Sequence, residues 1–262
     1  MASAETRPIS ARLNAGQVLL GFGVRALKTS DVGLIARSAG FDVLVIDREH
    51  GAFDAETVER LCAAAAMAGI DALVRLADPR DVGSALEAGA DGVVVTGIER
   101  AIQARDVVAR TLFPPHGRRS ASLTRGRVRG ESPSALADAQ AWNARAFICL
   151  VIESEEGMAN LDQIAAVPGV SALALGPLDY SLQLGVPHSP PHRLVEEAAR
   201  RVSQACAAHD LGRAAFSPAP GEDLRGTLVF SGNDLTYLMS GAEAVARHLR
   251  PGFVEAPAVR DS

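Results

Sequence analysis

The sequence is poor in cysteine, carries no excess of positive charge and has no long apolar run. Its three cysteines, Cys62, Cys149 and Cys206, lie far apart in apolar segments. This is more typical of reduced, buried thiols in the cytosol than of a disulfide or zinc framework. The net charge is −5, and no basic stripe is interleaved with aromatic residues, which argues against nucleic acid as a partner. No apolar run approaches the roughly 20 residues that span a bilayer, and MASAETRPIS has no apolar signal-peptide core. We therefore expect a cytoplasmic protein that binds neither nucleic acid nor membrane.

The chain does have many short apolar runs. Hydrophobic residues make up 48% and charged residues 22% of its 262 positions, an ordinary globular balance at a length that needs no disulfides. The runs are VLLGFGV (18–24), FDVLVID (41–47), DALVRL (71–76), DGVVVTG (91–97), FICLVIE (147–153), SALALGP (171–177), GRAAFSP (212–218) and TLVFSGN (227–233). Because they are short and apolar on both faces, they are typical of parallel strands covered by helices. Helix-like segments such as 54–69 and 191–210 lie between them.

Eight strands in strict alternation with helices predict a single (β/α)₈ barrel domain, an α/β fold, over residues 1–262. We expect its core at about 15–250, one long irregular connection at 113–135 and a tail at 251–262. A doubly wound open sheet is the alternative. It is disfavoured because GFG (21–23) lacks the third glycine, and the acidic residue about 20 positions on, of a dinucleotide fingerprint.

Charged residues follow several of these strands. Catalytic residues of a (β/α)₈ barrel lie at the carboxyl ends of its strands. Those ends carry Asp47–His50, Arg75, Glu153, Gly176–Asp179 and Asn233–Asp234. Two carboxylates (Glu153 and Asp179), a histidine and an arginine would thus share one rim, which predicts an active site.

The residue types at this rim predict the chemistry of the site. Carboxylates of Glu153 and Asp179, completed by water and substrate oxygens, suit a hard octahedral cation such as Mg²⁺ or Mn²⁺. Arg75 would stabilise negative charge on a substrate oxygen; the alternative is a structural ion pair with Asp47 or Glu49. His50 is the candidate general base or acid. Asp47 would either orient the imidazole of His50 or support the strand end.

The turn after the sixth strand predicts how a substrate carboxylate binds. Pro177 has no N–H, so Leu178 and Asp179, following Gly176, must supply any backbone donors there. Two such donors form a nest for a carboxylate. Arg75, Gly176, Leu178 and Asp179 are therefore the predicted substrate-binding residues, and the predicted ligand is a 2-oxo acid with its enolate.

These motifs resemble the metal-dependent class II pyruvate aldolases of the HpcH/HpaI family (4-hydroxy-2-oxo-heptane-dioate aldolase and relatives). The matching pieces are VIDREHGAFD (45–54), VRL (74–76), LEAGADGVVV (86–95), FPPHGRR (113–119), IESEEGMANLDQIAAVPGV (152–170) and GPLDYSLQLG (176–185). The resemblance implies a (β/α)₈ barrel and an aldehyde-lyase that joins pyruvate, or a related 2-oxo acid, to an aldehyde.

The resemblance also implies roles for single residues. Glu153 and Asp179 would hold Mg²⁺ or Mn²⁺, with Co²⁺ as a further candidate. Arg75 would stabilise the enolate, and His50, paired with Asp47, would transfer the proton. Family members are homo-oligomers, hexamers built as trimers of dimers. An acidic residue of the adjoining subunit reaches each site, and Glu87 matches its position; a plain charge on a helix face is the alternative for Glu87.

Several departures from the family pattern leave the substrate open. Arg48 and Val151 replace a small residue and a glutamine, and the 118–129 loop is rich in arginine. The charges of Arg48 and of the 118–129 loop motivate a second hypothesis, a citrate-forming branch of the family that joins oxaloacetate to an acetyl thioester. Arg119 is a candidate for binding a distal substrate carboxylate, or a residue of a solvated loop. A third hypothesis is a non-catalytic sensor of small acids.

Overall fold

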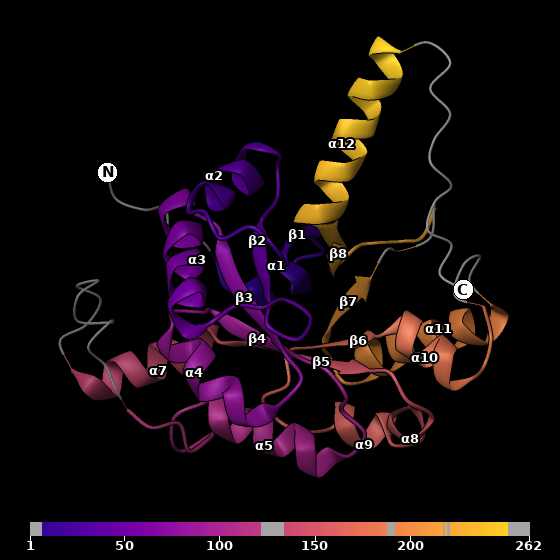
Figure 1. The fold of residues 1–262 in the computed structure, drawn as a ribbon. Helices are drawn as coiled ribbons and strands as arrows, with labels where there is room; N and C mark the ends of the chain where they lie inside the picture. The colour runs from indigo at the N-terminus through magenta and orange to yellow at the C-terminus, as the bar shows by residue number, and fades with distance from the viewer. Residues whose placement is uncertain (1–6, 122–133, 188–191, 217, 219–220, 251–262) are drawn as a thin grey trace.

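The computed structural model describes residues 7–121, 134–187, 192–216, 218 and 221–250, and it forms a closed barrel of eight parallel strands (Figure 1). The strands pair in chain order, and β8 closes the barrel on β1. They are β1 (Leu19–Val24), β2 (Val43–Asp47), β3 (Asp71–Leu76), β4 (Gly92–Val95), β5 (Phe147–Ile152), β6 (Ala172–Leu175), β7 (Gly212–Phe216) and β8 (Thr227–Asn233). All eight predicted strands are confirmed, whereas the predicted tail at 251–262 lies outside the described residues.

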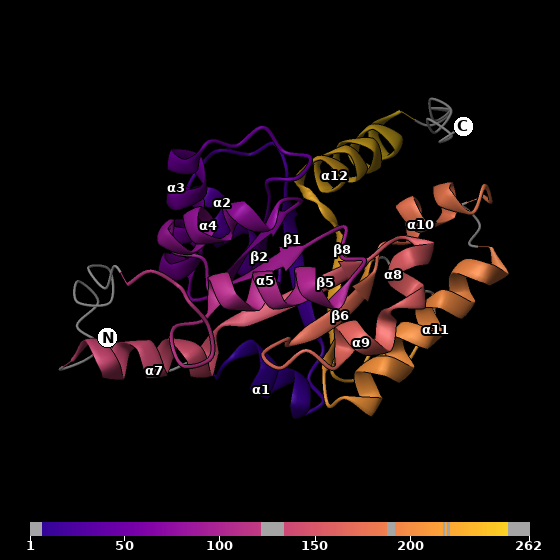
Figure 2. The ribbon, with the colours of Figure 1, turned by 90° about the horizontal axis from the view of Figure 1, so that it is seen from below.

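Helices surround the barrel (Figure 2). They are α1 (Ile9–Asn14), α2 (Asp31–Ser38), α3 (Ala55–Ala68), the 3₁₀ turn η1 (Pro79–Asp81), α4 (Val82–Glu87), α5 (Ala101–Thr111), α7 (Ala135–Arg145), α8 (Glu155–Ala159), α9 (Leu161–Ala165), α10 (Pro177–Gln183), α11 (Arg193–Ala208) and α12 (Asp234–Leu249). Asp54 caps α3 by accepting a hydrogen bond from the backbone N–H of Thr57, and Gly69 ends that helix in a left-handed conformation. None of the described helices is long and apolar enough to cross a membrane.

The core has two layers because most strands are buried on both faces. Val43 and Val45 of β2 point into the barrel, whose interior is closed at the amino end by Ile9 and Leu13 of α1. The alternate residues of β2, such as Leu44, pack outward against the helices. This packing holds the carboxyl ends of the strands at fixed positions, where the predicted site residues lie.

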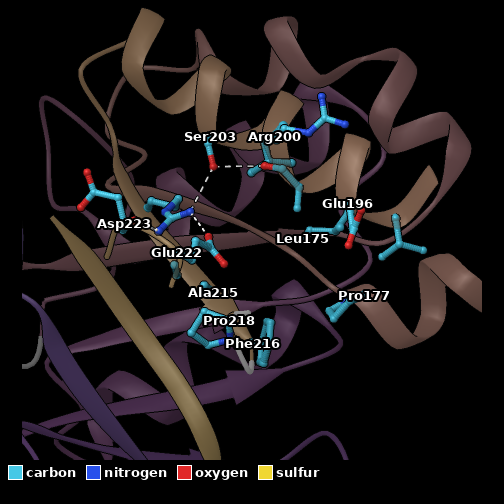
Figure 3. Close-up of a pocket in the computed structure, with 15 residues that line it drawn as sticks. Leu175, Pro177, Glu196, Arg200, Ser203, Ala215, Phe216, Pro218, Glu222 and Asp223 are labelled. Carbon is cyan, nitrogen blue, oxygen red and sulfur yellow. Dashed lines mark hydrogen bonds and ion pairs between the residues drawn. The ribbon is translucent and has the colours of Figure 1, made fainter. Parts of the chain in front are cut away.

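The alternation of strands and helices is broken once in the described part of the chain, after β7. The connection to β8 forms no helix in its described residues, and its sequence, SPAPGED (217–223), contains two prolines and a glycine, which disfavour a helix. A cavity of about 500 Å³ opens beside it, outside the barrel, between β7 and α11 (Figure 3). Apart from the described residues of this crossover, strands and helices alternate as expected. In both views of the ribbon α12, which follows β8, projects away from the barrel (Figures 1 and 2).

Candidate active site

The carboxyl ends of β2 and β3 place a carboxylate and a guanidinium side by side. Asp47 and Arg75 are register partners in these strands. Arg75 Nε donates to Asp47 Oδ1 at 3.1 Å, and Arg75 Nη2 donates to Asp47 Oδ2 at 2.9 Å. This two-point pair fixes the plane of the guanidinium.

Asp47 is the most heavily hydrogen-bonded carboxylate at this rim. It is 6% exposed and accepts, besides Arg75, the backbone N–H groups of Glu49 and His50 and the Nε of Arg25. Burial by itself raises the pKa of Asp47, but the hydrogen bond from His50 and the charges of Arg75 and Arg25 outweigh it and lower the pKa below its ordinary value. Asp47 is therefore an anion that holds the strand end and two arginines in place.

Glu49 is a site residue to which the sequence analysis gave no role beyond a candidate ion pair. Its Oε2 lies 3.1 Å from Arg75 Nε, and its Oε1 accepts a hydrogen bond from Thr96 Oγ1 at 2.6 Å. Its side chain is only 16% exposed. The only signal in the sequence for Glu49 as a site residue was its charge within the DREH run (47–50). Thr96, the hydrogen-bond partner of Glu49, lies just after β4 and has no distinguishing pattern around it. Arg75 thus does form ion pairs with both Asp47 and Glu49, the alternative that the sequence left open.

His50 lies beside these carboxylates with a half-exposed ring. The backbone N–H of His50 donates to Asp47 Oδ1, and the carboxylate beside the imidazole is Glu49, whose Oε2 lies 3.6 Å from His50 Nε2. Of the two roles considered for Asp47, the described contacts correspond to support of the strand end: Asp47 orients the backbone of His50. The reason is the tight turn after β2, which brings the amide groups of residues 49 and 50 back to the strand end.

Glu153 and Asp179 come from the neighbouring strand ends on the other side of the rim. Glu153 follows β5, and Asp179 lies in the first turn of α10, after β6. Burial, followed by the negative charges of Glu49 and Asp179, raises the pKa of Glu153 to about 7. The two predicted metal carboxylates are therefore close enough to repel each other, and a cation between them would relieve this repulsion.

The backbone around Glu153 leaves room for its carboxylate. A Cβ added to Gly176 would lie 2.6 Å from Glu153 Oε2, so a larger residue there would displace the Glu153 side chain. Pro177 opens α10, and the amides of Leu178 and Asp179 lie in its first turn, where a helix has no acceptors for its own N–H groups. In the described part of the chain no three His, Cys, Asp or Glu side chains gather as a metal cluster. The donor set is thus two hard carboxylates, which fits Mg²⁺ or Mn²⁺ completed by substrate and water oxygens.

The structure does not bring Glu87 and Arg119 to the rim of their own chain. Glu87 ends α4 shortly before the start of β4, at the amino end of the barrel. Arg119 Nη2 lies 3.1 Å from Glu87 Oε1, and its guanidinium stacks on the rings of Phe113 and Trp142. Only 10% of the Arg119 side chain is exposed, so Arg119 is not a residue of a solvated loop.

A cavity of about 140 Å³ opens beside Asp47 and Arg75 at the carboxyl end of the barrel. It is lined by Gly21, Gly23, Arg25, Val45, Asp47, Arg75, Val94, Phe216, Phe230, Gly232 and Asn233. This cavity joins an apolar interior to the charged groups of β2 and β3, so it is the space in which a small substrate would meet Arg75.

A (β/α)₈ barrel with a carboxylate pair and an arginine–carboxylate fork on one rim is an arrangement that can stabilise negative charge on a small oxygenated substrate. The family model "HpcH/HpaI aldolase/citrate lyase" matches residues 27–217, and the chain belongs to this family. Its named relatives are aldolases, which are lyases.

Two relatives and one solved structure illustrate the similarity. A 4-hydroxy-2-oxo-heptane-1,7-dioate aldolase of Salmonella arizonae is 32% identical over 251 residues, covering 89% of this chain and 91% of the relative. A 2-keto-3-deoxy-L-rhamnonate aldolase of Escherichia coli is 30% identical over 208 residues, covering 76% of each chain. The crystal structure of an HpcH/HpaI aldolase from Desulfitobacterium hafniense is 27% identical, has a TM-score of 0.84 and covers 95% of this chain and 100% of its own.

Proposed function

We propose that this protein is a class II aldolase that cleaves or forms 4-hydroxy-2-oxo acids, with pyruvate or a related 2-oxo acid and an aldehyde as the small-molecule partners. The observation that carries the proposal is the pairing of Glu153 and Asp179 on the same rim as the Asp47–Arg75 fork. The relatives named above are aldolases of 2-oxo acids, which supports the same substrate class.

Aldolases of this family generally need a divalent metal. We propose that Glu153 and Asp179 hold Mg²⁺ or Mn²⁺, with Co²⁺ as a further candidate. The cation, when bound, supplies a Lewis acid for the 2-oxo acid. Backbone N–H groups of Leu178 and Asp179, presented by the turn at Gly176, would bind the substrate carboxylate, because the first amides of a helix favour anions.

The remaining steps use side chains of β2 and β3. In the cleavage direction His50 takes the proton of the C4 hydroxyl, the C3–C4 bond breaks, and C4 becomes the carbonyl carbon of the aldehyde. The electron pair of the broken bond is delocalised from C3 to the C2 oxygen, where Arg75 stabilises the charge. Protonation at C3 then gives the 2-oxo acid. Glu49, beside the ring of His50, would stabilise the imidazolium that forms.

We also propose that the enzyme is a cytoplasmic homo-oligomer, with the hexameric trimer of dimers as the specific expectation. The projecting helix α12 supports association, because it exposes large apolar side chains, namely Leu235, Leu238, Met239, Val245 and Leu249. In such an assembly Glu87 would reach the site of an adjoining subunit. The molar mass in solution, from light scattering, tests this proposal.

The deciding experiment measures release of pyruvate from 4-hydroxy-2-oxo acids before and after removal of metal with a chelator. We expect activity to vanish and to return with Mg²⁺ or Mn²⁺; activity that survives complete metal removal contradicts the proposal. Two of the arginines that motivated the citrate-forming alternative, Arg118 and Arg119, already bind Asp106 and Glu87, and the rest of that run, from 122 on, lies outside the described residues. Release of thiol from acetyl-CoA with oxaloacetate would still establish that alternative. Binding of pyruvate without exchange of its methyl protons in D₂O would establish the sensor.

A further inference from the structure

Arg25 is a second arginine in the reaction cavity, and the mechanism above does not use it. It follows directly on β1 and lines the cavity together with Asp47 and Arg75. Arg75 uses Nε and Nη2 to bind two carboxylates. Among the described residues, by contrast, the side chain of Arg25 donates a single hydrogen bond, from Nε to Asp47 Oδ2 at 3.1 Å. Its side chain is 36% exposed, which leaves its two terminal nitrogens as donors for a ligand.

Hydrogen bonds to Asp234 fix the backbone of Arg25. The carboxylate of Asp234, the first residue of α12, is 1% exposed and accepts the backbone N–H groups of Arg25, Ala26 and Leu27 at 3.1, 2.9 and 2.6 Å. Asp47 fixes the other end of the side chain through Nε. The guanidinium is therefore positioned before any ligand arrives, and this preorganisation strengthens binding.

Glycines and aromatic rings line part of the cavity next to Arg25. A Cβ added to Gly23 would lie 2.4 Å from the carbonyl oxygen of Gly232, and one added to Gly21 would lie 3.0 Å from a methyl group of Val45. Glycine at these positions leaves the floor without side chains, and the Phe216 and Phe230 rings, 4.7 Å apart between centroids, form an apolar wall. A ligand with a short hydrocarbon body and an anionic end fits this combination.

The larger cavity between β7 and α11 is lined by two arginines, Arg200 and Arg213. Arg213 already binds Ser203, Thr227, Glu222 and the carbonyl group of Asp223, and Arg200 is an exposed residue of α11. Neither Arg75 nor Glu153 lines this cavity. An anionic substrate group therefore has its partner in Arg25.

We propose that Arg25 binds a carboxylate at the distal end of the aldehyde part of the substrate. The enzyme would then prefer 4-hydroxy-2-oxo dicarboxylic acids for cleavage, and aldehydes that carry a carboxylate for condensation. The inference rests on the proposed aldolase function. The terminal nitrogens of a guanidinium match the two oxygens of a carboxylate in one plane. The distal carboxylate would lie on the side of β1 and β8, while the 2-oxo acid end lies on the side of β5 and β6. This assigns to Arg25 the role that the sequence analysis gave to Arg119.

The test compares two aldehydes of equal carbon number, succinic semialdehyde and butanal, each condensed with pyruvate by the Mn²⁺-loaded enzyme. For Arg25→Gln we expect kcat/KM with succinic semialdehyde to fall about 10- to 100-fold, mainly through KM, because a charge-assisted contact is lost. With butanal we expect a change of less than about threefold. Arg25→Lys keeps the charge without the fork and should retain an intermediate preference. Arg37→Gln, an exposed arginine of α2, is the matched control.

The outcomes separate the inference from the function on which it rests. Equal losses with both aldehydes mean that Arg25 only positions Asp47 and overturn the inference, as does an unchanged kcat/KM for succinic semialdehyde. If the wild-type enzyme condenses neither aldehyde with pyruvate, the proposed function itself fails, and the inference fails with it. If circular dichroism shows that Arg25→Gln does not fold, the kinetics of Arg25→Lys test the inference. A lysine variant that keeps the full preference for succinic semialdehyde over butanal contradicts a contact between the guanidinium and both carboxylate oxygens.

Discussion

Asp47 and Arg75 are register partners on adjacent strands, and they are joined by two hydrogen bonds that tie a carboxylate to one edge of a guanidinium. Glu49 lies against the same Nε. The arginine therefore cannot rotate, and its direction toward the cavity is set by the pairing of β2 with β3. In this barrel, strand register thus determines the direction of the Arg75 guanidinium.

Arg75→Lys tests whether this fixed direction serves catalysis. Lysine keeps the charge but cannot make the two-point pair. We expect kcat/KM for aldol cleavage to fall about 10²- to 10³-fold, the usual effect of removing one stabilising donor, with Mn²⁺ affinity unchanged. Arg80→Lys is the control, because Arg80 pairs with Asp78 at the exposed surface. Normal kinetics of Arg75→Lys would mean that the ion pairs of Arg75 are only structural.

Gly176→Ala tests the position of Glu153, the proposed metal ligand. The added Cβ would lie 2.6 Å from Glu153 Oε2 and 2.8 Å from Glu153 Cβ, so the Glu153 side chain must move. We expect Mn²⁺ affinity, measured by calorimetry, to fall at least tenfold while the fold is kept. The control is Gly83→Ala in α4, where the new Cβ meets nothing within 4 Å. Unchanged affinity in Gly176→Ala would argue against Glu153 as a ligand.

The pH dependence of metal binding follows from Glu153. Its pKa is raised from an ordinary value of 4.5 to about 7, chiefly by burial. Metal must therefore displace a proton below pH 7, and we expect the apparent affinity for Mn²⁺ to fall about tenfold per pH unit there and to level off above it. In the metal-free protein the folded state holds this extra proton between about pH 4.5 and 7, so its contribution to the free energy of unfolding falls as pH rises through that range.

Calorimetry in two buffers that differ in ionisation enthalpy measures the proton released on metal binding. We expect release at pH 6.5 in the wild-type protein and no Mn²⁺ binding in Glu153→Gln. Glu155→Gln, which changes an exposed carboxylate of α8, should behave as the wild type. Binding that is independent of pH between 6 and 8 would contradict the role of Glu153.

The strands could be predicted from the sequence because each one is apolar on both faces. Their order then follows from topology, and topology alone brings Glu153 and Asp179 to one rim. Side-chain partners could not be predicted in this way. Arg75 had two neighbouring carboxylates available and pairs with both, and Asp47 binds the backbone of His50 where a contact with the ring was expected. Such choices depend on turn geometry within about 1 Å, which no residue pattern encodes.

The position of Arg119 could not be predicted from the sequence either. It belongs to the irregular connection after α5, whose path has no periodicity, so the sequence could not tell at which end of the barrel it lies. The backbone N–H of Arg119 donates to the carbonyl group of Leu112, at the end of α5. This contact turns the side chain toward Trp142 and Glu87 at the amino end of the barrel.

Replacement of Arg119 should therefore affect stability and leave substrate binding unchanged. Arg119→Met removes a buried cation stacked on two rings and paired with Glu87. We expect the free energy of unfolding in urea to fall by about 1–3 kcal/mol, since a desolvated cation–π contact contributes up to about 2 kcal/mol and the ion pair to a half-exposed carboxylate up to about 1 kcal/mol. Glu87→Gln removes only the ion pair and should cost at most about 1 kcal/mol. A contrary result would be a raised KM for succinic semialdehyde in Arg119→Met with unchanged stability. It would place Arg119 at a substrate site, and that site would have to lie between two subunits, because Arg119 is not at the rim of its own chain.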